Sequence, residues 1–242
     1  MNLTEKIRTV EALLAEVGDS YRPAAFANSF GAEDMVLTDL IARGVPSIEI
    51  FTLDTGRLPE ATHTLMRQLV DRYDLPIRIY YPDASELEAL LTQSGPNAFF
   101  DSVDLRQACC GVRKVSPLRR ALRGKRAWIT GLRREQSPTR TDIAPAEFDR
   151  EHGMQKFNPL FDWTRTEVWS YIRDRGLPYN ALHDEGYASI GCAPCTRAIT
   201  VGEDERAGRW WWENPATKEC GLHPAKSAAS DARSPEMDKA AS

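Results

Sequence analysis

The stretch AAFANSFGAEDMVLTDLIA, residues 24–42, passes from a short apolar run through a glycine-containing loop into an amphipathic segment. The run Ala24–Asn28 predicts a buried strand, and Glu33–Ala42 predicts the helix that follows. A strand, a glycine loop and a helix in this order direct backbone N–H groups and the positive end of the helix dipole towards a bound anion. Ser29 adds a hydroxyl donor, and Gly31 lets a ligand approach the backbone closely. An ordinary strand-to-helix turn has the same pattern, so this loop needs support from elsewhere in the chain.

The same alternation of apolar runs and amphipathic segments continues along the chain. It predicts an α/β fold with a mostly parallel sheet and helices on both faces. Further strands are expected at Ser47–Leu53, Ile77–Tyr81, Ala127–Gly131 and Met154–Asn158, and further helices at Pro59–Tyr73, Ser85–Leu91, Val112–Leu122 and Thr164–Arg175.

Two more strand ends carry residues suited to a ligand. The second strand ends in Leu53-Asp54-Thr55-Gly56, and the fourth ends in Thr130-Gly131-Leu132-Arg133-Arg134. Open α/β sheets bind ligands outside the carboxyl ends of their strands, so these loops support the phosphate-site interpretation of the first one. The glycine followed by arginines fits an oxyanion clamp, because a guanidinium can grip two oxygens at once.

The composition indicates an ordinary globular enzyme-sized chain. With 242 residues, 42% apolar and 27% charged, it fits one large domain that can bury a substantial core. It has no run of 18 apolar residues and no basic, apolar start, so we expect neither a membrane span nor a signal peptide. A cytoplasmic location follows as the expectation, with thiols kept reduced and no membrane partner.

The net charge of −4 conceals a basic block. Residues 113–140 contain ten Lys or Arg and one acid, Glu135. Such a block in an acidic chain indicates a local anionic ligand more than a nucleic-acid surface, so we expect no nucleic-acid partner. A solvated helix face is the alternative for part of the block. The block's members are Arg113, Lys114, Arg119, Arg120, Arg123, Lys125, Arg126, Arg133, Arg134 and Arg140.

The five cysteines divide into four and one. Cys109-Cys110 and Cys192-Ala193-Pro194-Cys195 form two close pairs, whose four thiolates suit one tetrahedral metal or one iron–sulfur cluster. Adjacent cysteines face one group only at a bend or a helix end, which Gly111 permits. A vicinal disulfide and a zinc site are the alternatives for these residues.

The fifth cysteine, Cys220, has no second cysteine nearby in the sequence, so a disulfide step there needs another protein's thiols. Its polar, glycine-containing surroundings Glu219-Cys220-Gly221-Leu222-His223 favour exposure, and an inert buried thiol is the alternative. The preceding run Trp210-Trp211-Trp212 suits core packing or, alternatively, base stacking or a lid.

After residue 178 the periodic pattern ends. We expect a nucleotide-binding, cluster-bearing α/β domain over 1–200, a C-terminal arm with Cys220 over 201–224, and a disordered tail rich in Ala, Ser, Asp and Lys over 225–242.

Taken in order, these motifs resemble those of the assimilatory adenylyl-sulfate reductases, the thioredoxin-dependent reductases of adenosine 5′-phosphosulfate (APS). Close relatives are the reductases of phosphoadenylyl sulfate (PAPS). The resemblance covers residues 20–224 and implies an adenine nucleotide α-hydrolase-like (PP-loop) fold. It implies that a 4Fe–4S cluster is held by four ligands, and these are Cys109, Cys110, Cys192 and Cys195. It implies that Cys220 attacks the sulfur of APS to form a thiosulfonate, from which thioredoxin releases sulfite for cysteine biosynthesis.

The resemblance also assigns substrate-binding residues. Nucleotide would be held at Ser29, Gly31, Leu53 and Gly131, and the phosphate–sulfate group at Lys114, Arg140, Arg206 and Arg209. PAPS-specific relatives usually lack the four cluster cysteines, so APS is the expected substrate, with PAPS or dual use as the alternative. Plant-type members carry a fused thioredoxin-like domain, whereas this sequence ends 18 residues after Pro224, so a separate thioredoxin is expected. Homo-oligomerisation stays open.

Two other functions are weaker alternatives. A PP-loop tRNA-thiolating enzyme carries a Ser-Gly-Gly-x-Asp-Ser loop, whereas here the loop reads Ser29-Phe30-Gly31-Ala32-Glu33-Asp34. An iron–sulfur or zinc sensor with a nucleotide site would leave Cys220 without a role.

Overall fold

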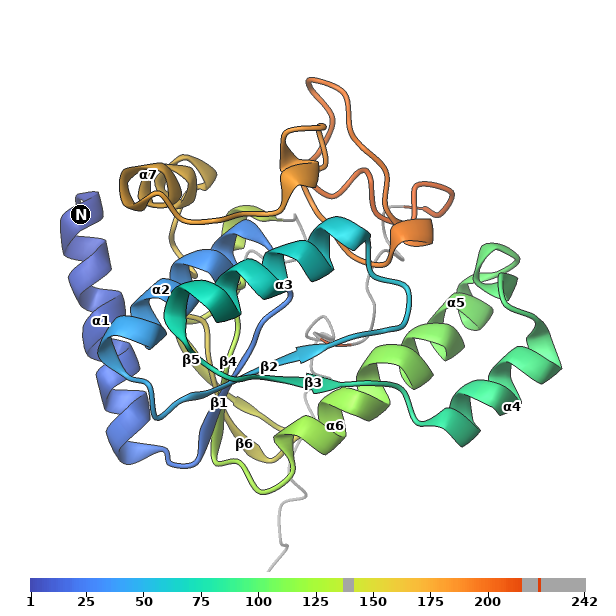
Figure 1. The fold of residues 1–242 in the computed structure, drawn as a ribbon, viewed down its shortest axis with the longest axis horizontal. Helices are drawn as coiled ribbons and strands as arrows, with labels where there is room; N and C mark the ends of the chain where they lie inside the picture. The colour runs from blue at the N-terminus through green and yellow to red at the C-terminus, as the bar shows by residue number, and fades with distance from the viewer. Residues whose placement is uncertain (137–141, 215–221, 223–242) are drawn as a thin grey trace, which may run out of the picture.

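The computed structural model describes residues 1–136, 142–214 and 222, and its centre is a six-stranded sheet in the order β3-β2-β1-β4-β6-β5 (Figure 1). β5 is antiparallel to β6, and every other pairing is parallel. The predicted α/β fold with a mostly parallel sheet is therefore confirmed. The strands are β1 Ala24–Ala27, β2 Glu49–Leu53, β3 Ile77–Tyr80, β4 Ala127–Ile129, β5 Ala146–Asp149 and β6 Met154–Phe157.

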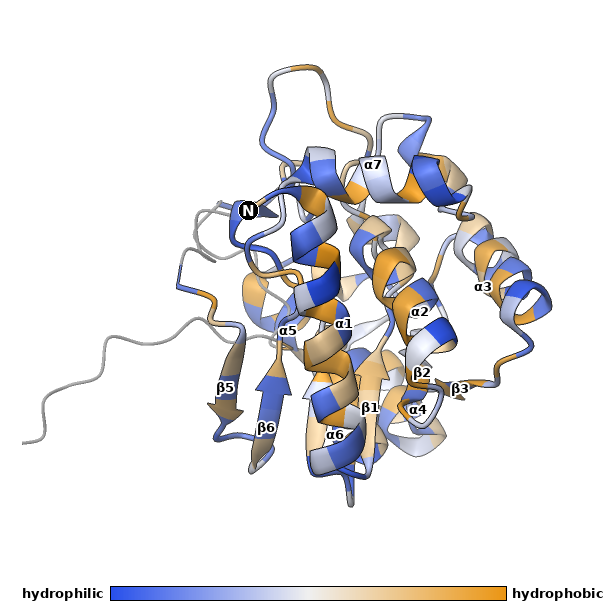
Figure 2. Ribbon diagram, turned by 90° about the vertical axis from the view of Figure 1, so that its left-hand side faces the viewer, coloured by the Kyte–Doolittle hydropathy of each residue, from blue (hydrophilic) through white to orange (hydrophobic). Residues whose placement is uncertain are grey.

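All five predicted strands are present, and the sequence analysis missed β5. This edge strand pairs with β6 alone, and its four side chains are exposed or half-buried. Figure 2 shows the contrast in hydropathy between the central strand β1, which is hydrophobic, and β6 near the edge, which is hydrophilic. A short polar strand at a sheet edge leaves little apolar signal in a sequence.

In the described part of the chain, seven α-helices surround the sheet. The predicted helices correspond to α2, α3, α4, α6 and α7, whereas α1 and α5 were not predicted. The signal for α1 was available: Asn2 and Glu5 form a capping box, and Val10, Leu14 and Val17 are buried at helical spacing. The helices are α1 Leu3–Ser20, α2 Ala32–Gly44, α3 Glu60–Tyr73, α4 Ala84–Ser94, α5 Val103–Cys110, α6 Ser116–Leu122 and α7 Arg165–Arg175. None of the helices in the described ranges combines the length and apolar character that a membrane span needs.

The two faces of the sheet build two cores. Phe26 and Ile129 point to the face covered by α1, α2, α3 and α7, while Ala25, Phe51 and Trp128 point to the face covered by α6. This alternation is the period-two geometry of strands, and the helices lie on both sides of the sheet as predicted (Figure 1).

The part of the expected C-terminal arm that the structure describes contacts the α/β domain directly. Thr196 and Arg209 form an isolated antiparallel bridge, and the Trp210 N–H donates to the Cys195 carbonyl at 3.2 Å. The side chain of Arg106 on α5 donates two hydrogen bonds to Glu213, at 2.8 and 2.9 Å. Residues 196–213 are thus tied to the domain by backbone and side-chain contacts.

Candidate functional site

A cavity of about 230 Å³ opens at the carboxyl ends of β1, β2 and β4. Parallel strands bring these ends to one edge of the sheet, which is why loops that lie far apart in the sequence share one cavity. Of the eight predicted substrate-binding residues, seven line it: Ser29, Gly31, Leu53, Lys114, Gly131, Arg206 and Arg209. The eighth, Arg140, lies outside the described residues, as do Cys220 and His223. Leu222, two residues after Cys220 in the sequence, lines the cavity as well.

The loop after β1 is organised by Asp34. One oxygen of its carboxylate accepts hydrogen bonds from the Ser29 N–H at 2.6 Å and from the Ser29 hydroxyl at 2.7 Å. The Ser29 hydroxyl proton, expected to face an anion, is therefore used inside the protein. Phe30 follows with a positive φ of 61° and a buried ring, and its N–H donates to the Asn28 side chain at 2.7 Å. These contacts fix the turn that places Gly31 at the start of α2.

Asp34 is a buried carboxyl group in a cavity suited to an anion. Burial raises its pKa to about 7, although the two hydrogen bonds from Ser29 oppose this change. Gly131 lies against it: a Cβ added there would be 2.2 Å from an Asp34 oxygen. Gly131 is thus required by the close approach of the β4 loop to the start of α2.

The cations of the cavity come from two segments. Lys114 lies in a π-helix, Gly111–Val115, that joins α5 to α6, and Arg206 and Arg209 come from the segment that follows the second cysteine pair. The Arg209 guanidinium lies 4.7 Å from the Trp210 ring centroid and donates to the Ile190 carbonyl at 3.2 Å. These positions suit the binding of a strongly anionic group.

The four paired cysteines line a second cavity, together with Lys114. The helix end expected beside the adjacent cysteines is not present, because the backbone stays helical from α5 through Gly111–Val115 into α6; what changes after Cys110 is the hydrogen-bond pattern, which becomes that of a wider π-helical turn. On the other side, Cys192 precedes a short 3₁₀ turn, Ala193–Cys195, and lies 3.3 Å from the Thr55 hydroxyl. No disulfide joins these four cysteines.

The cysteines differ in acidity. Burial raises the pKa of the Cys192 thiol, but Lys114 and the Thr55 hydroxyl outweigh burial, and the pKa lies below its ordinary value. Burial and the neighbouring Cys192 raise the pKa of Cys195 to about 12. Four thiolates in one buried space repel one another, so the full set ionises only around a positively charged group.

The donor set suits an extended group more than a single ion. A zinc ion binds sulfur at about 2.3 Å, which draws its ligands close together. Within the ranges described, no three His, Cys, Asp or Glu side chains are gathered at the spacing of a single metal ion. The N–H groups Arg113 Nε and Trp210 Nε1 are buried beside the cysteines without a hydrogen-bond partner in the described part of the chain. Iron–sulfur clusters accept such hydrogen bonds at their sulfurs, so these residues fit a cluster.

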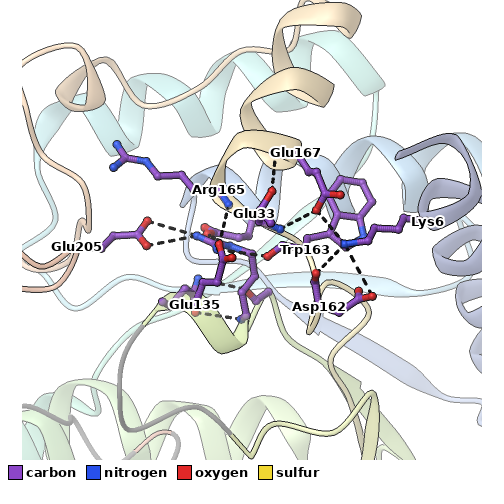
Figure 3. Close-up of polar contacts among 12 residues, drawn as sticks. Lys6, Glu33, Glu135, Asp162, Trp163, Arg165, Glu167 and Glu205 are labelled. Carbon is purple, nitrogen blue, oxygen red and sulfur yellow. Dashed lines mark hydrogen bonds and ion pairs between the residues drawn. The ribbon is translucent and has the colours of Figure 1, made fainter. Parts of the chain in front are cut away.

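The oxyanion clamp expected at Arg133 and Arg134 is wrong in its geometry, because neither residue lines the large cavity. Arg133 is fully buried, with its Nε donating to Glu33 at 2.7 Å and its Nη2 to Glu205 at 3.3 Å. Figure 3 labels these two carboxylate partners, Glu33 and Glu205. Arg134 donates to the Ile143 carbonyl and covers the Phe161 ring.

Sequence reasoning also missed several residues that line the cavity. Glu33 and Glu205 are there, and so is His183, whose burial lowers its pKa. Glu33 was visible as part of the first loop, whereas nothing in the local sequence marks Glu205 or His183 as neighbours of that loop. In the tryptophan run, Trp210 is buried beside the cysteines as core packing would require, and Trp211 is exposed.

A mostly parallel sheet with a cavity across the carboxyl ends of its central strands defines an α/β protein of the kind that binds its ligand at this edge of the sheet. Residues 23–198 match the phosphoadenosine phosphosulfate reductase domain, and the chain belongs to this family. It is 54% identical over 224 residues to an adenosine 5′-phosphosulfate reductase of Allochromatium vinosum, covering 91% of this chain and 88% of that protein. A reductase of the same name from Burkholderia cepacia is 49% identical over 222 residues, covering 91% and 88%.

The fold is also that of a solved relative. A phosphoadenylyl-sulfate reductase from Candida auris, crystallised with phosphate, superposes with a TM-score of 0.68 at 26% identity, covering 81% of this chain and 96% of that one. The predicted adenine nucleotide α-hydrolase-like architecture is therefore confirmed.

Proposed function

We propose that this chain reduces APS to sulfite and AMP. The observation that carries the proposal is the cavity that holds Lys114, Arg206 and Arg209 beside the two glycine loops, in a chain about half identical to proteins named adenosine 5′-phosphosulfate reductase. In this proposal Ser29, Gly31, Leu53 and Gly131 hold the nucleotide. The three cations and Arg140 hold the phosphate–sulfate group.

The proposed chemistry has two displacement steps. The Cys220 thiolate attacks the sulfur of APS, a sulfur–sulfur bond forms, and the bond from sulfur to the bridging phosphate oxygen breaks, so that AMP leaves. A thiolate of thioredoxin then attacks the Cys220 sulfur and expels sulfite. Its second thiol resolves the mixed disulfide, so the dithiol supplies both electrons. The cations matter in the first step because they neutralise charge between a thiolate and a sulfate.

The second cavity is proposed to hold a 4Fe–4S cluster on Cys109, Cys110, Cys192 and Cys195. The cluster would supply a fixed charge and a rigid anchor beside Lys114. Lys114 supports this part of the proposal, because it lines both cavities and lowers the pKa of Cys192. A cytoplasmic setting is included in the proposal, since these thiols must stay reduced.

Intact mass spectrometry after incubation with APS alone tests the proposal. We expect a mass gain of one SO₃ located on Cys220, no gain in the Cys220→Ser variant, and release of sulfite when reduced thioredoxin is added. Unmodified Cys220 in the presence of released AMP would overturn the thiosulfonate step. A parallel incubation with PAPS distinguishes APS from dual use, which the likeness to a PAPS reductase makes the second candidate.

The cluster has its own test. Cys192→Ser should lose bound iron and the absorbance near 400 nm, whereas Cys220→Ser should keep both. Full activity in an iron-free protein would contradict the assignment.

A further inference from the structure

Arg133 joins three parts of the cavity wall without lining the cavity. It follows β4, its Nε donates to Glu33 at the start of α2, and its Nη2 donates to both oxygens of Glu205 at 3.3 and 3.4 Å. Its Nη1 donates to the Trp163 carbonyl at 3.4 Å (Figure 3). The guanidinium is fully buried, while the two carboxylates are largely buried and do line the cavity.

This arrangement makes Glu205 depend on Arg133. Burial raises the pKa of Glu205, and Arg133 is the strongest of the groups that oppose this change. When the charged partner of a largely buried carboxylate is removed, the ionised form of the carboxylate becomes unfavourable at that position. Glu203, two residues earlier, has different neighbours: it pairs with Arg197 at 2.7 Å and does not line the cavity.

Glu205 directly precedes Arg206, so the contact of Glu205 with Arg133 also restrains the backbone that carries Arg206. Arg206 is the next residue, and its N–H donates to Asp204 at 2.8 Å. Arg209 follows, and it has an anchor of its own in the backbone bridge to Thr196. Arg206 therefore lies between two attachments, the Glu205 ion pair on one side and the bridge on the other.

We propose that Arg133 is a positioning residue, which holds Glu205 and through it places Arg206 over the substrate cavity. Because Glu33 shares the same guanidinium, the loop that follows β1 and the segment that carries Arg206 are fixed relative to each other. This inference rests on the proposed function, in which Arg206 binds the phosphate–sulfate group.

The test is a double-mutant cycle in the full-length protein with its bound cofactor. Binding of APS is measured on the Cys220→Ser background, where no turnover occurs. Glu205→Gln keeps the size of the side chain and removes its charge, and we expect it to weaken APS binding about tenfold. Glu203→Gln, the matched control in the same segment, should leave binding unchanged.

The cycle separates positioning from a general structural effect. Arg206→Ala should cost severalfold less affinity in the Glu205→Gln background than alone, while Arg209→Ala should cost the same in both backgrounds. Arg133→Lys, which keeps the charge but loses the fork, should reproduce part of the Glu205→Gln loss with the unfolding midpoint little changed. Additive losses for Glu205 and Arg206, or an equal loss from Glu203→Gln, would overturn the inference.

The same measurements keep this inference distinct from the proposed function. If the protein binds neither APS nor AMP, or if Arg206→Ala alone has no effect, the proposed substrate site is wrong. If Arg206→Ala weakens APS binding and the cycle is additive, the site stands and only the positioning role of Arg133 fails.

Discussion

Replacing Asp34 by Asn should change how the stability of the protein depends on pH. Asp34 is buried, and its pKa in the folded protein is raised to about 7 from 3.8. Between these two values the folded state holds a proton that the unfolded state has released. Stability therefore falls as pH rises through this window, because the unfolded chain binds fewer protons than the native one. Asn cannot ionise, so the variant lacks this contribution while keeping an oxygen that accepts from Ser29.

The size of the effect follows from the two pKa values. A shift of about 3 pKa units corresponds to about 4 kcal/mol when the window has been crossed completely. Between pH 5 and pH 8 the linkage relation gives a loss of about 3 kcal/mol for the wild type relative to Asp34→Asn. Below about pH 3 and above pH 8 the difference should level off, since both states then carry the same number of protons at this site.

Urea unfolding of both proteins at half-unit steps from pH 4 to pH 8.5 measures this difference directly. The free energy of unfolding of the variant, relative to that of the wild type, should increase steadily from pH 5 to pH 7. The plateau above pH 8 acts as an internal control, because the other titrating groups are shared by both proteins and cancel. A difference that stays constant from pH 5 to pH 8, or that changes in the opposite direction, would refute the assignment of a buried, proton-holding Asp34.

Three further substitutions test separate contacts. Gly131→Ala places a methyl group 2.2 Å from an Asp34 oxygen, so we expect a loss of about 1–3 kcal/mol in stability and weaker AMP binding in a calorimetric titration; unchanged AMP affinity would contradict this. Tyr171→Phe removes a 2.7 Å hydrogen bond to the buried carboxylate of Asp39 and should lower the free energy of unfolding by about 1.5–3 kcal/mol in urea, whereas an equally stable variant would show that the bond contributes nothing. Arg106→Gln removes the guanidinium that pairs with the buried carboxylate of Glu213 and should cost about 3–5 kcal/mol in the same assay; a loss below 1 kcal/mol would argue against a buried pair.

The sheet was predictable from the sequence because its central strands are buried on both faces. β1 and β4 consist of short, continuous apolar runs, and β2 is apolar at Ile50, Phe51 and Leu53, which the sequence shows directly. β5 was missed because an edge strand with one neighbour needs no such run. Helix α1 was predictable as well, because its capping box and the helical spacing of Val10, Leu14 and Val17 are visible in the sequence.

The cavity was predictable for a topological reason, and its side-chain partners were not. Parallel strands bring their carboxyl ends together, so loops after β1, β2 and β4 were expected to share a ligand. Ion-pair partners follow no such rule. Arg133 and Glu205 are 72 residues apart in the sequence. The local pattern assigns Arg133 to an oxyanion, whereas in the structure its guanidinium pairs with the carboxylates of Glu33 and Glu205. The Ser29 hydroxyl likewise donates to Asp34. The sequence places these two residues close together, but it does not show that their side chains point toward each other.

Lys114 connects the cavity of the four paired cysteines to the cavity at the strand ends. This residue lies in the π-helix that follows Cys110, and it lines both the cysteine cavity and the cavity at the strand ends. A wider helical turn rotates the residues that follow it around the helix axis. The π-helix Gly111–Val115 therefore affects which side of the helix carries Lys114. A charged group held by the four cysteines, as proposed, would therefore influence anion binding in the cavity at the strand ends through Lys114. A substitution among the four should change the affinity for an anionic nucleotide even where the fold survives, while a change at Cys220 should leave that affinity intact.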